Sequence, residues 1–265
     1  MRYLIAILAI SAVVAGCRPA STQPQADATP TPVPPPAVPV RSVTPNPAPT
    51  PGEGIVITTP IEADLSKFAD APQEDWVFID PAETDVPTAR TFGPDGMKMR
   101  VLTGRDLYAD NLTAPRLVRS VKGDLELTAR VSASPKENYQ GAGLLIYADA
   151  KNYIRFERSH GGVDDADGNG IRLDVRLGDE YRAVTTPRSA PFTGSDVELR
   201  LVRIGSKIRA FYRGDEKSPW KPAGEVEAQL ADNVFAGVIG CNTGGEFNVG
   251  FRWIRLTPAD EKTAK

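Results

Sequence analysis

From about Ile55 onward, the chain is a succession of short apolar runs separated by glycine, proline, aspartate and asparagine. No stretch keeps a helical apolar periodicity for more than two turns. The strand-like runs cover residues 125–131, 143–147, 152–158, 171–177, 197–202, 207–212, 235–239 and 249–256. Short runs at this spacing, bounded by turn-forming residues, are typical of an all-β sandwich.

Period-2 alternation is clearest over residues 171–177, where aliphatic and charged side chains take turns. The aliphatic set is Ile171, Leu173, Val175 and Leu177, and the charged set is Arg172, Asp174 and Arg176. Such a strand turns one face to a core and the other to solvent or a ligand. Turn-forming sequences at 167–170, 203–206 and 213–215 agree with this pattern. The sequence therefore predicts an all-β fold with two antiparallel sheets packed as a sandwich.

Proline divides the chain into parts. Thirteen of the 24 prolines lie between Pro19 and Pro60, in a segment with few large apolar residues. Such a segment cannot bury enough surface to offset its ordering entropy, and proline favours extended polyproline II. We predict a signal peptide at 1–16, a lipidated cysteine and proline-rich disordered linker at 17–54, a sandwich domain at 55–258, and a polar tail at 259–265.

The first seventeen residues predict export. Arg2 precedes an apolar run from Leu4 to Val14, which is too short for a bilayer span of about 20 residues. The run ends in Val-Ala-Gly-Cys17, which resembles the lipobox of bacterial lipoproteins and implies acylation of Cys17. Arg18, rather than aspartate, implies the outer membrane in a Gram-negative host. An ordinary secretory signal with a chance cysteine is the alternative.

Charge and cysteine content exclude several classes of function. The formal net charge is −3, and removal of residues 1–16 takes away Arg2 and makes it −4. This mildly acidic balance offers no footprint for nucleic acid. The chain has two cysteines, so lipidation of Cys17 would leave Cys241 without a disulfide partner. Apolar residues around Cys241 predict a buried, inert thiol.

A longer motif carries a family resemblance. Residues 141–157, Gly-Ala-Gly-Leu-Leu-Ile-Tyr-Ala-Asp-Ala-Lys-Asn-Tyr-Ile-Arg-Phe-Glu, resemble the central signature of concanavalin A-like jelly-roll domains. The pattern is similar to the sandwich domain appended to some β-xylosidases and to a related family of uncharacterised function. Further matches lie at 197–205, 207–212, Trp220, 235–239 and 251–256, so the resemblance covers about 61–258. It implies the fold and leaves function open, because this sandwich serves lectins, hydrolases and adhesive modules.

Catalysis is not predicted. Jelly-roll glycosidases need two carboxylates around the scissile bond, and the Glu-x-Asp-x-Glu pattern of active relatives is absent. Glu157 and Asp174 could face each other across adjacent strands. We expect Arg155, Arg172 and Arg176 beside them to lower both carboxyl pKa values, which does not suit a general acid. The expectation is therefore a protein that is not an enzyme.

Calcium is the one cofactor that the sequence suggests. Asp165, Asp167 and Asn169, followed by glycine, match the opening of a calcium loop, in which alternate oxygens converge on the cation. The twelfth position of that frame is Arg176 instead of the bidentate glutamate. An acidic hairpin tip without metal is the alternative.

A ligand-binding face is predicted on the strands around 153 and 174. If Ile154 and Phe156 point into the core, the neighbouring polar side chains share the opposite face. The candidate ligand-binding residues are Tyr147, Tyr153, Arg155, Glu157, Arg172, Asp174 and Arg176. Tyr181 and Trp220 could flank them, although we expect Trp220 to pack in a hairpin and not to serve as a sugar platform. An arginine-rich face suits acidic glycans or carboxylate ligands. A charged, ion-paired sheet face without a ligand is the alternative.

These observations predict a lipoprotein anchored to the membrane through its N-terminal lipid, with a non-catalytic domain that binds carbohydrate or an envelope glycan. A structural or protein-interaction lipoprotein of the envelope is the second reading. A glycoside hydrolase with an unrecognised site is the third.

Overall fold

The computed structural model describes residues 49–68, 75–81, 88–163, 165, 167–259 and 261. The chain divides into two compact units, Met1–Ser42 and Val43–Lys265, and the described residues belong to the second. The predicted signal peptide, Cys17, most of the linker and most of the tail lie outside the described residues. No described segment forms a helix with the length and apolarity that a bilayer crossing requires.

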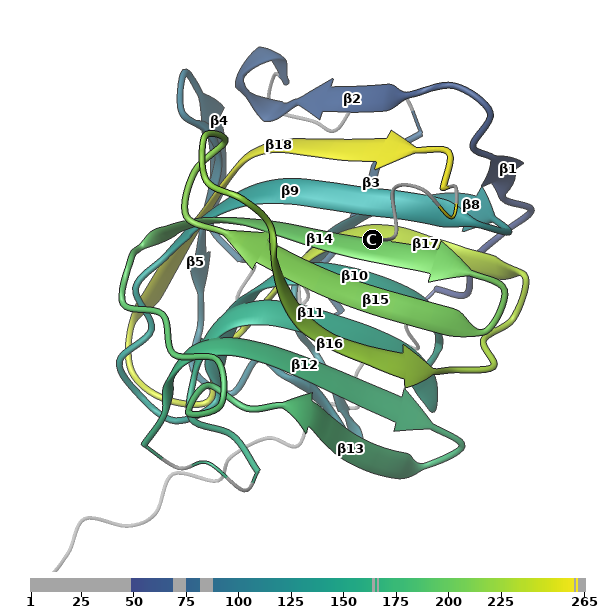
Figure 1. The fold of residues 1–265 in the computed structure, drawn as a ribbon. Coiled ribbons are helices and arrows are strands. Elements are labelled where there is room, and N and C mark those ends of the chain that lie inside the picture. Colours follow the sequence, from purple (N-terminus) through teal and green to yellow (C-terminus); the bar gives the residue numbers. More distant parts are fainter. Residues whose placement is uncertain are drawn as a thin grey trace, which may run out of the picture. The chain divides into compact units, whose positions relative to one another are not determined.

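One sheet holds all seven candidate ligand-binding residues. Figure 1 shows the arrangement of its strands. Its strands are β1 (Ile55–Val56), β3 (Val77–Ile79), β8 (Arg116–Lys122), β10 (Gln140–Asp149), β11 (Asn152–His160), β12 (Asn169–Leu177), β13 (Glu180–Thr185) and β17 (Asn233–Cys241). They follow the order β1-β8-β17-β10-β11-β12-β13, and β3 also pairs with β8. All pairings are antiparallel except the short parallel pair of β1 and β8.

The second sheet has the order β16-β15-β14-β9-β18-β5-β4, with β2 beside β18. These strands are β2 (Ile61–Asp64), β4 (Arg90–Gly93), β5 (Gly96–Val101), β9 (Leu125–Ala133), β14 (Asp196–Ile204), β15 (Lys207–Arg213), β16 (Lys221–Glu227) and β18 (Phe247–Thr257). A 3₁₀ turn, η1 (Leu65–Lys67), follows β2, and β6 (Leu107–Tyr108) and β7 (Asn111–Leu112) form a separate hairpin.

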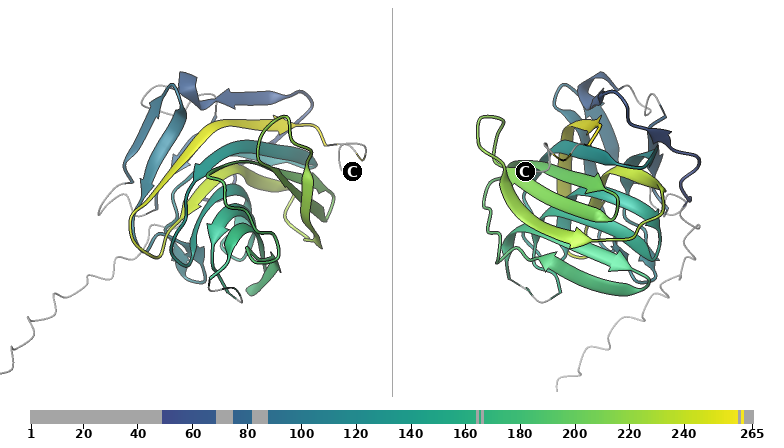
Figure 2. Two further views of the ribbon diagram at one scale, coloured as in Figure 1. Left: turned by 60° about the vertical axis from the view of Figure 1, so that its left-hand side comes forward. Right: turned by 45° about the vertical axis from the view of Figure 1, so that its right-hand side comes forward.

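The two sheets pack face to face around one apolar core, and Figure 2 shows the two layers from two further directions. Leu144 of β10 and Phe156 of β11 are fully buried in this core together with Leu127 and Ala129 of β9. Alternate residues of each strand supply these side chains, as expected for a pleated sheet. The prediction of an all-β, two-sheet antiparallel sandwich is confirmed.

The eight runs predicted as strands all form strands, and each extends at one or both ends beyond its predicted range. The prediction missed β8, whose sequence Arg-Leu-Val-Arg-Ser-Val-Lys does not alternate. Leu117 enters the main core, and its neighbour Val118 enters a second apolar cluster on the other face. A strand buried on both faces loses the period-2 pattern. The edge strand β16 was missed because Pro222 and Gly224 weaken its strand signal.

The main core makes a first prediction. Leu144→Ala removes a fully buried side chain from the centre of β10, and we expect a loss of about 2–5 kcal/mol in the free energy of unfolding. Urea denaturation measures this loss. The exposed control Lys217→Ala should stay within about 0.5 kcal/mol of the parent chain. Equal effects of the two changes would contradict the packing described here.

Candidate functional site

The outer face of the first sheet carries the predicted ligand-binding residues of β11 and β12. Arg155 lies opposite Asp174, Glu157 lies opposite Arg172, and Tyr153 lies opposite Arg176. Ile154 and Phe156 point into the main core, as the alternation requires. Charges of opposite sign are therefore direct cross-strand neighbours, which is the favourable arrangement in a sheet.

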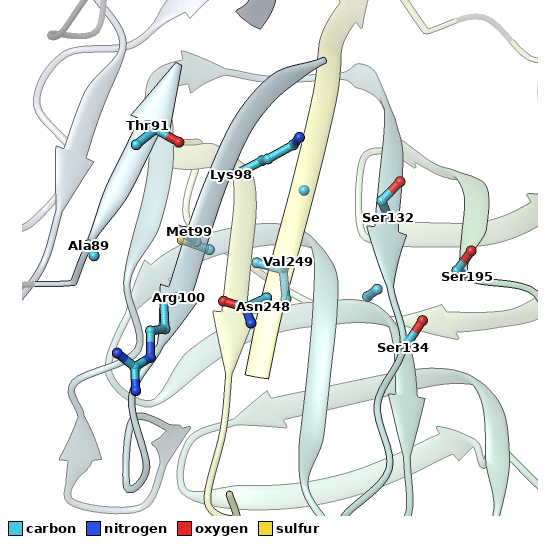
Figure 3. Close-up of a pocket in the computed structure, with 12 residues that line it drawn as sticks. Ala89, Thr91, Lys98, Met99, Arg100, Ser132, Ser134, Ser195, Asn248 and Val249 are labelled. Carbon is cyan, nitrogen blue, oxygen red and sulfur yellow. The ribbon is translucent and has the colours of Figure 1, made fainter. Parts of the chain in front are cut away.

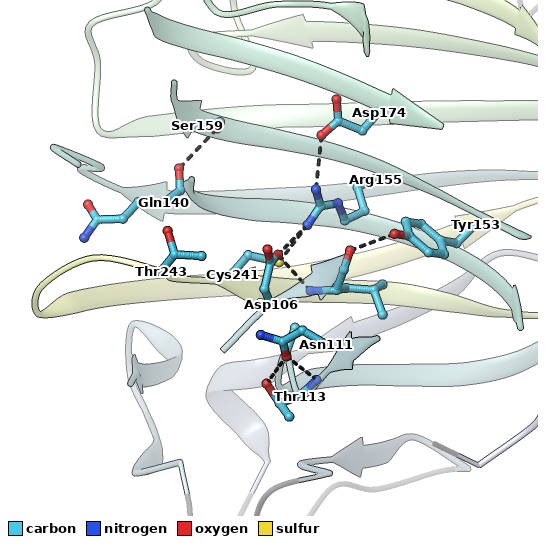
Figure 4. Close-up of polar contacts among 12 residues, drawn as sticks. Asp106, Asn111, Thr113, Gln140, Tyr153, Arg155, Ser159, Asp174, Cys241 and Thr243 are labelled. Atoms are coloured by element: carbon cyan, nitrogen blue, oxygen red, sulfur yellow. Dashed lines mark hydrogen bonds and ion pairs between the residues drawn. The ribbon is translucent and has the colours of Figure 1, made fainter. Parts of the chain in front are cut away.

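Part of this face is closed by the β6–β7 hairpin, which covers a second apolar cluster. Tyr147 and Tyr153 belong to this cluster, with ring centroids 6.3 Å apart. The Tyr153 hydroxyl donates a 2.7 Å hydrogen bond to the carbonyl of Leu107 in the hairpin (Figure 4). Both tyrosines are buried, so in this structure they hold the hairpin on the sheet and do not line a ligand pocket.

A pocket of about 370 Å³ lies beside the hairpin on the same face. Its floor includes three of the predicted residues, Arg155, Glu157 and Arg172. Other lining residues come from several segments: Asp106, Tyr108, Tyr139, Ser159, Gly161, Gly162, Val163, Tyr181, Cys241 and Thr243. Sequence reasoning missed most of these, because loops and strand ends far apart in the chain supply them.

A buried ion-pair network forms the base of the pocket. Asp174, which is fully buried, accepts hydrogen bonds at Oδ2 from Arg172 Nε at 2.8 Å and from Arg155 at 3.2 Å. Arg155 also donates to Asp106 Oδ1 at 3.0 Å (Figure 4). Charges removed from water are tolerated when they are paired and hydrogen-bonded in this way. The network therefore fixes the directions of both arginine side chains.

The remaining nitrogens of Arg172 are also occupied. They donate to the carbonyls of Gly161 at 3.3 Å and Val163 at 3.2 Å, and to the Tyr181 hydroxyl at 2.9 Å. Gly162 has a φ of 135°, and a Cβ there would lie 2.1 Å from Nη1 of Arg172. The absence of a side chain at this position lets the loop close over the guanidinium group.

Glu157 differs from the other charged residues of the site. It is 3% exposed, and no described residue donates a hydrogen bond to its buried Oε1 atom. Burial raises the pKa of the Glu157 carboxyl group, and this effect exceeds the opposite influence of Arg155. Arg155 and Arg172 do lower the pKa of Glu157, as expected, but the expected net lowering is wrong because burial outweighs them. Arg155 and Arg172 are hydrogen-bonded to Asp174 and other acceptors, which leaves Glu157 without an ion pair among the described residues.

Two exposed tyrosines stand among the lining residues, Tyr108 at 41% and Tyr139 at 42% exposure. Tyr139 has a φ of 63°, a left-handed conformation that is uncommon for a residue with a side chain. The Tyr108 ring meets the Tyr181 ring edge to face, with centroids 5.2 Å apart. Large aromatic side chains held in water at the mouth of a polar pocket are a typical feature of ligand sites.

Cys241 lines the pocket as a thiol. Its Sγ lies 3.2 Å from a terminal nitrogen of Arg155, and the residue is 2% exposed. Burial raises the pKa of the Cys241 thiol well above its usual value, so the thiol stays protonated. A protonated buried thiol is a poor nucleophile. The predicted burial of the Cys241 thiol is confirmed, and its low reactivity stays a prediction.

Two other predicted residues lie outside the pocket. Arg176 forms an ion pair with Asp179 at 3.0 Å in the turn between β12 and β13. Trp220 directly precedes β16 of the other sheet, and the guanidinium carbons of Arg213 and Arg200 lie 4.4 and 5.2 Å from its ring centroid. Of the two predicted flanking aromatics, Tyr181 lines the pocket and Trp220 does not.

In the predicted calcium loop, the side-chain oxygens of Asp165 and Asn169 accept hydrogen bonds from other residues of the chain. Asp165 is buried, and its carboxylate accepts a hydrogen bond from the backbone N–H of Arg188 at 2.5 Å. Asn169 Oδ1 accepts a hydrogen bond from Arg158 at 2.5 Å. Within the described part of the chain, no group of three or more histidine, cysteine or acidic side chains could hold a metal ion. Calcium binding by Asp165, Asp167 and Asn169 stays a prediction.

A larger hollow of about 520 Å³ lies on the outer face of the second sheet (Figure 3). Its charged side chains, Lys98 and Arg100, are more than half exposed and form ion pairs with Asp95 and Glu246. Three serines, 132, 134 and 195, line another part of it. This hollow has no buried charged group, so we place the candidate site in the pocket on the first sheet.

Sequence comparison identifies the family. Residues 103–259 match the family described as "Protein of unknown function (DUF1349)", which is more than half of the chain. The chain belongs to the DUF1349 family. The whole pocket lies within the matched range, so it is a feature of the DUF1349 part of the chain. No curated protein sequence matches the chain.

Solved structures share the fold of this DUF1349 protein. The GH43 protein BlXynB from Bacillus licheniformis aligns with a TM-score of 0.58 and 17% identity, over 75% of this chain and 39% of its own. A xylan β-1,4-xylosidase from Bacillus halodurans aligns with a TM-score of 0.54 and 15% identity, over 74% of this chain and 38% of its own. A functionally unknown protein from Saccharomyces cerevisiae aligns with a TM-score of 0.54 and 12% identity, over 70% of this chain and 97% of its own.

The chain therefore spans about two fifths of each bacterial relative and nearly all of the yeast protein. At these identities the likeness establishes the fold. The resemblance to a sandwich domain appended to β-xylosidases is confirmed in that sense, and function has to be argued from the site.

The Gly161–Val163 loop makes a second prediction. Gly162→Ala forces a side chain into a φ of 135° and against Arg172, so we expect a loss of at least about 2 kcal/mol in the free energy of unfolding. Gly178→Ala is the matched control, because Gly178 also has a positive φ, 57°, but nothing lies within 4 Å of its added Cβ. Its expected cost is about 1 kcal/mol. A smaller cost at 162 than at 178 would contradict the close contact with Arg172.

Proposed function

We propose that this chain carries a non-catalytic carbohydrate-binding domain, which takes a short glycan segment into the pocket on the outer face of the first sheet. The observation that carries this proposal is the combination of the exposed Tyr108 and Tyr139 rings with a buried polar floor. Sugar recognition uses aromatic rings against apolar sugar faces and planar polar groups for the hydroxyls. The pocket supplies both types of group.

The size of the pocket supports a short ligand. Its volume of about 370 Å³ lies near the lower end of the range for ligand sites, about 300–1,000 Å³. A glycan end or a short stretch of a chain fits this volume better than an extended polymer. Aromatic rings at the mouth would contact the bound sugar unit and the unit that follows it.

The carboxylates of the site support binding without hydrolysis. Glycoside hydrolysis by the usual route needs two carboxyl groups around the scissile bond, one as acid and one as base or nucleophile. Asp106, which lines the pocket, is ion-paired with Arg155. Among the described lining residues, Glu157 is left as the one carboxyl group without an arginine partner. A single free carboxyl group is suited to hydrogen bonding.

A third prediction concerns the exposed Tyr139 ring at the mouth of the pocket. Tyr139→Gly should weaken glycan binding about tenfold, because it removes an exposed ring from the pocket. The free energy of unfolding should change by less than about 1 kcal/mol, since relief of the left-handed conformation is offset by the greater chain entropy of glycine. Calorimetric titration with a glycan selected on an array measures the affinity.

The control is Asp179→Gly, which also replaces a positive-φ residue (81°) but lies outside the pocket. This change should leave the affinity unaltered. A full-length, folded chain that binds no glycan on the array would overturn the proposed function. If Tyr139→Gly and Asp179→Gly lost affinity equally, the glycan would not bind in this pocket.

We also propose that the protein is exported and anchored to the outer membrane as a lipoprotein through Cys17, with the proline-rich segment 18–54 as a spacer. The support is the Val14–Cys17 sequence and the apolar run before it. Several acyl chains hold a protein on a membrane much more firmly than one chain does.

Metabolic labelling tests the anchor. An alkyne fatty acid supplied to a Gram-negative host should label the full chain, and Cys17→Ser should abolish the label because it removes the acylated thiol. Labelling that persists in Cys17→Ser would contradict lipidation at this residue. Release of the unlabelled parent chain into the soluble fraction would favour an ordinary secretory signal.

A further inference from the structure

The pocket arginines are neutralised within the protein. Arg172 directs all three guanidinium nitrogens to acceptors of the chain, and Arg155 directs both terminal nitrogens to Asp106, Asp174 and Cys241. Both side chains are less than one tenth exposed. An acidic ligand that bound the terminal nitrogens of Arg155, or Nε of Arg172, would have to displace a buried aspartate, which would leave that carboxylate buried and unpaired. The arginine-rich composition of this face therefore does not make it a site for anions.

The charge balance points the same way. Two arginines, 155 and 172, face three carboxyl groups, those of Asp106, Glu157 and Asp174. Burial raises the pKa of the neighbouring Tyr181 hydroxyl and Cys241 thiol, so neither group adds charge at ordinary pH. The two arginines balance the two aspartate carboxylates, so the region carries no net positive charge whether Glu157 is protonated or ionised. An anion would gain no attraction to offset its loss of hydration.

Among the described lining residues, Glu157 is the carboxyl group that forms no ion pair. It is more than nine tenths buried, it lines the pocket, and its Oε1 atom accepts no hydrogen bond from a described residue. Gly141 leaves the space that the carboxylate occupies, because a Cβ there would lie 2.9 Å from Glu157 Oε2. A buried polar atom without a hydrogen bond destabilises the fold, and a ligand that supplies a donor recovers part of this cost.

We infer that the pocket selects an uncharged sugar unit, whose hydroxyl groups donate hydrogen bonds to the Glu157 carboxylate while a ring face packs on Tyr139. This inference rests on the carbohydrate-binding function proposed above and specifies its ligand class. Uncharged sugars are rich in hydroxyl donors. They carry no ionic group that would have to lose its hydration on binding. The ion-paired arginines serve as a rigid floor that holds Glu157 and the loop at 161–163 in place.

The ligand class is tested with the full-length chain on an array of neutral and uronic-acid glycans of matched length, followed by calorimetric titration. We expect binding only to neutral glycans, with an affinity that changes less than twofold between 50 and 500 mM NaCl, because screening has little effect on an uncharged ligand. Preferential binding of uronic-acid glycans that weakens with salt would overturn this inference and leave the carbohydrate-binding function intact. A folded chain that binds no glycan would overturn both.

The role of Glu157 is tested with Glu157→Gln, which keeps the shape of the side chain and removes its charge. We expect about tenfold weaker binding of the neutral glycan at pH 7, since hydrogen bonds to a charged acceptor are the stronger ones. Glu180→Gln, on the exposed end of β13, is the matched control and should bind as the parent does. Parent-like binding by Glu157→Gln, with loss in Tyr139→Gly, would overturn the assignment of Glu157.

A pH profile separates binding by Glu157 from a structural role. The ionisable groups that face Glu157 are Arg155 on its own strand, Arg172 and Asp174 on β12, Asp106 beside the hairpin and Cys241 on β17. Ligand hydroxyls favour the ionised carboxylate, so the parent affinity should fall as the pH drops through the raised pKa of Glu157. The Glu157→Gln variant should show no such fall over that pH range. Identical profiles would overturn the inference.

Thermal unfolding gives an independent readout. Because the folded-state pKa of Glu157 is raised, the folded protein binds the proton more tightly, and the ionised group destabilises the fold at high pH. Glu157→Gln should therefore have a higher melting temperature than the parent at pH 7, and this gain should disappear below the ordinary glutamate pKa. A lower melting temperature at pH 7 would show that Glu157 is a stabilising ion-pair partner, contrary to the inference.

Discussion

The buried carboxylate of Asp174 is the contact on which the rest of the site depends. It is fully buried and binds two arginines on two adjacent strands. Through Arg155 it is linked to Asp106 beside the β6–β7 hairpin, and through Arg172 to the loop at 161–163. A charge in this position is tolerated only with its partners, so the network specifies how the loops meet the sheet.

Much of the fold could be predicted from the sequence, because residues such as Ile171, Leu173 and Val175 alternate clearly with charged neighbours. The same alternation placed Arg155, Glu157 and Arg172 on one face, and the structure brings these three into one pocket. Strand β8 gave no such signal because it is buried on both faces. The pocket walls could not be predicted, since a residue such as Tyr139 reaches the site through a loop conformation that has no periodic pattern.

The difference between Glu157 and Asp174 explains why counting charges along a strand was misleading. Both carboxyl groups lie beside arginines in sequence and in space. Asp174 receives hydrogen bonds from both guanidinium groups at Oδ2 and from no described residue at Oδ1, whereas Glu157 forms an ion pair with neither arginine. The free energy of a buried carboxyl group depends on directed hydrogen bonds as well as on nearby charge. The strand pattern identifies neighbours, but it does not assign the donors.

The position of β13 at the edge of its sheet has a kinetic consequence. β13 is hydrogen-bonded to one neighbour, β12, and the register shifts between Leu173 and Asp174, next to the ion-pair network. Edge strands with an irregular register open locally at lower free energy than central strands. Tyr181 of β13 accepts a hydrogen bond from Arg172, so each opening of this edge also loosens one wall of the pocket. If the pocket binds a glycan as proposed, the rate at which the ligand enters and leaves would depend on the fraying of this single strand.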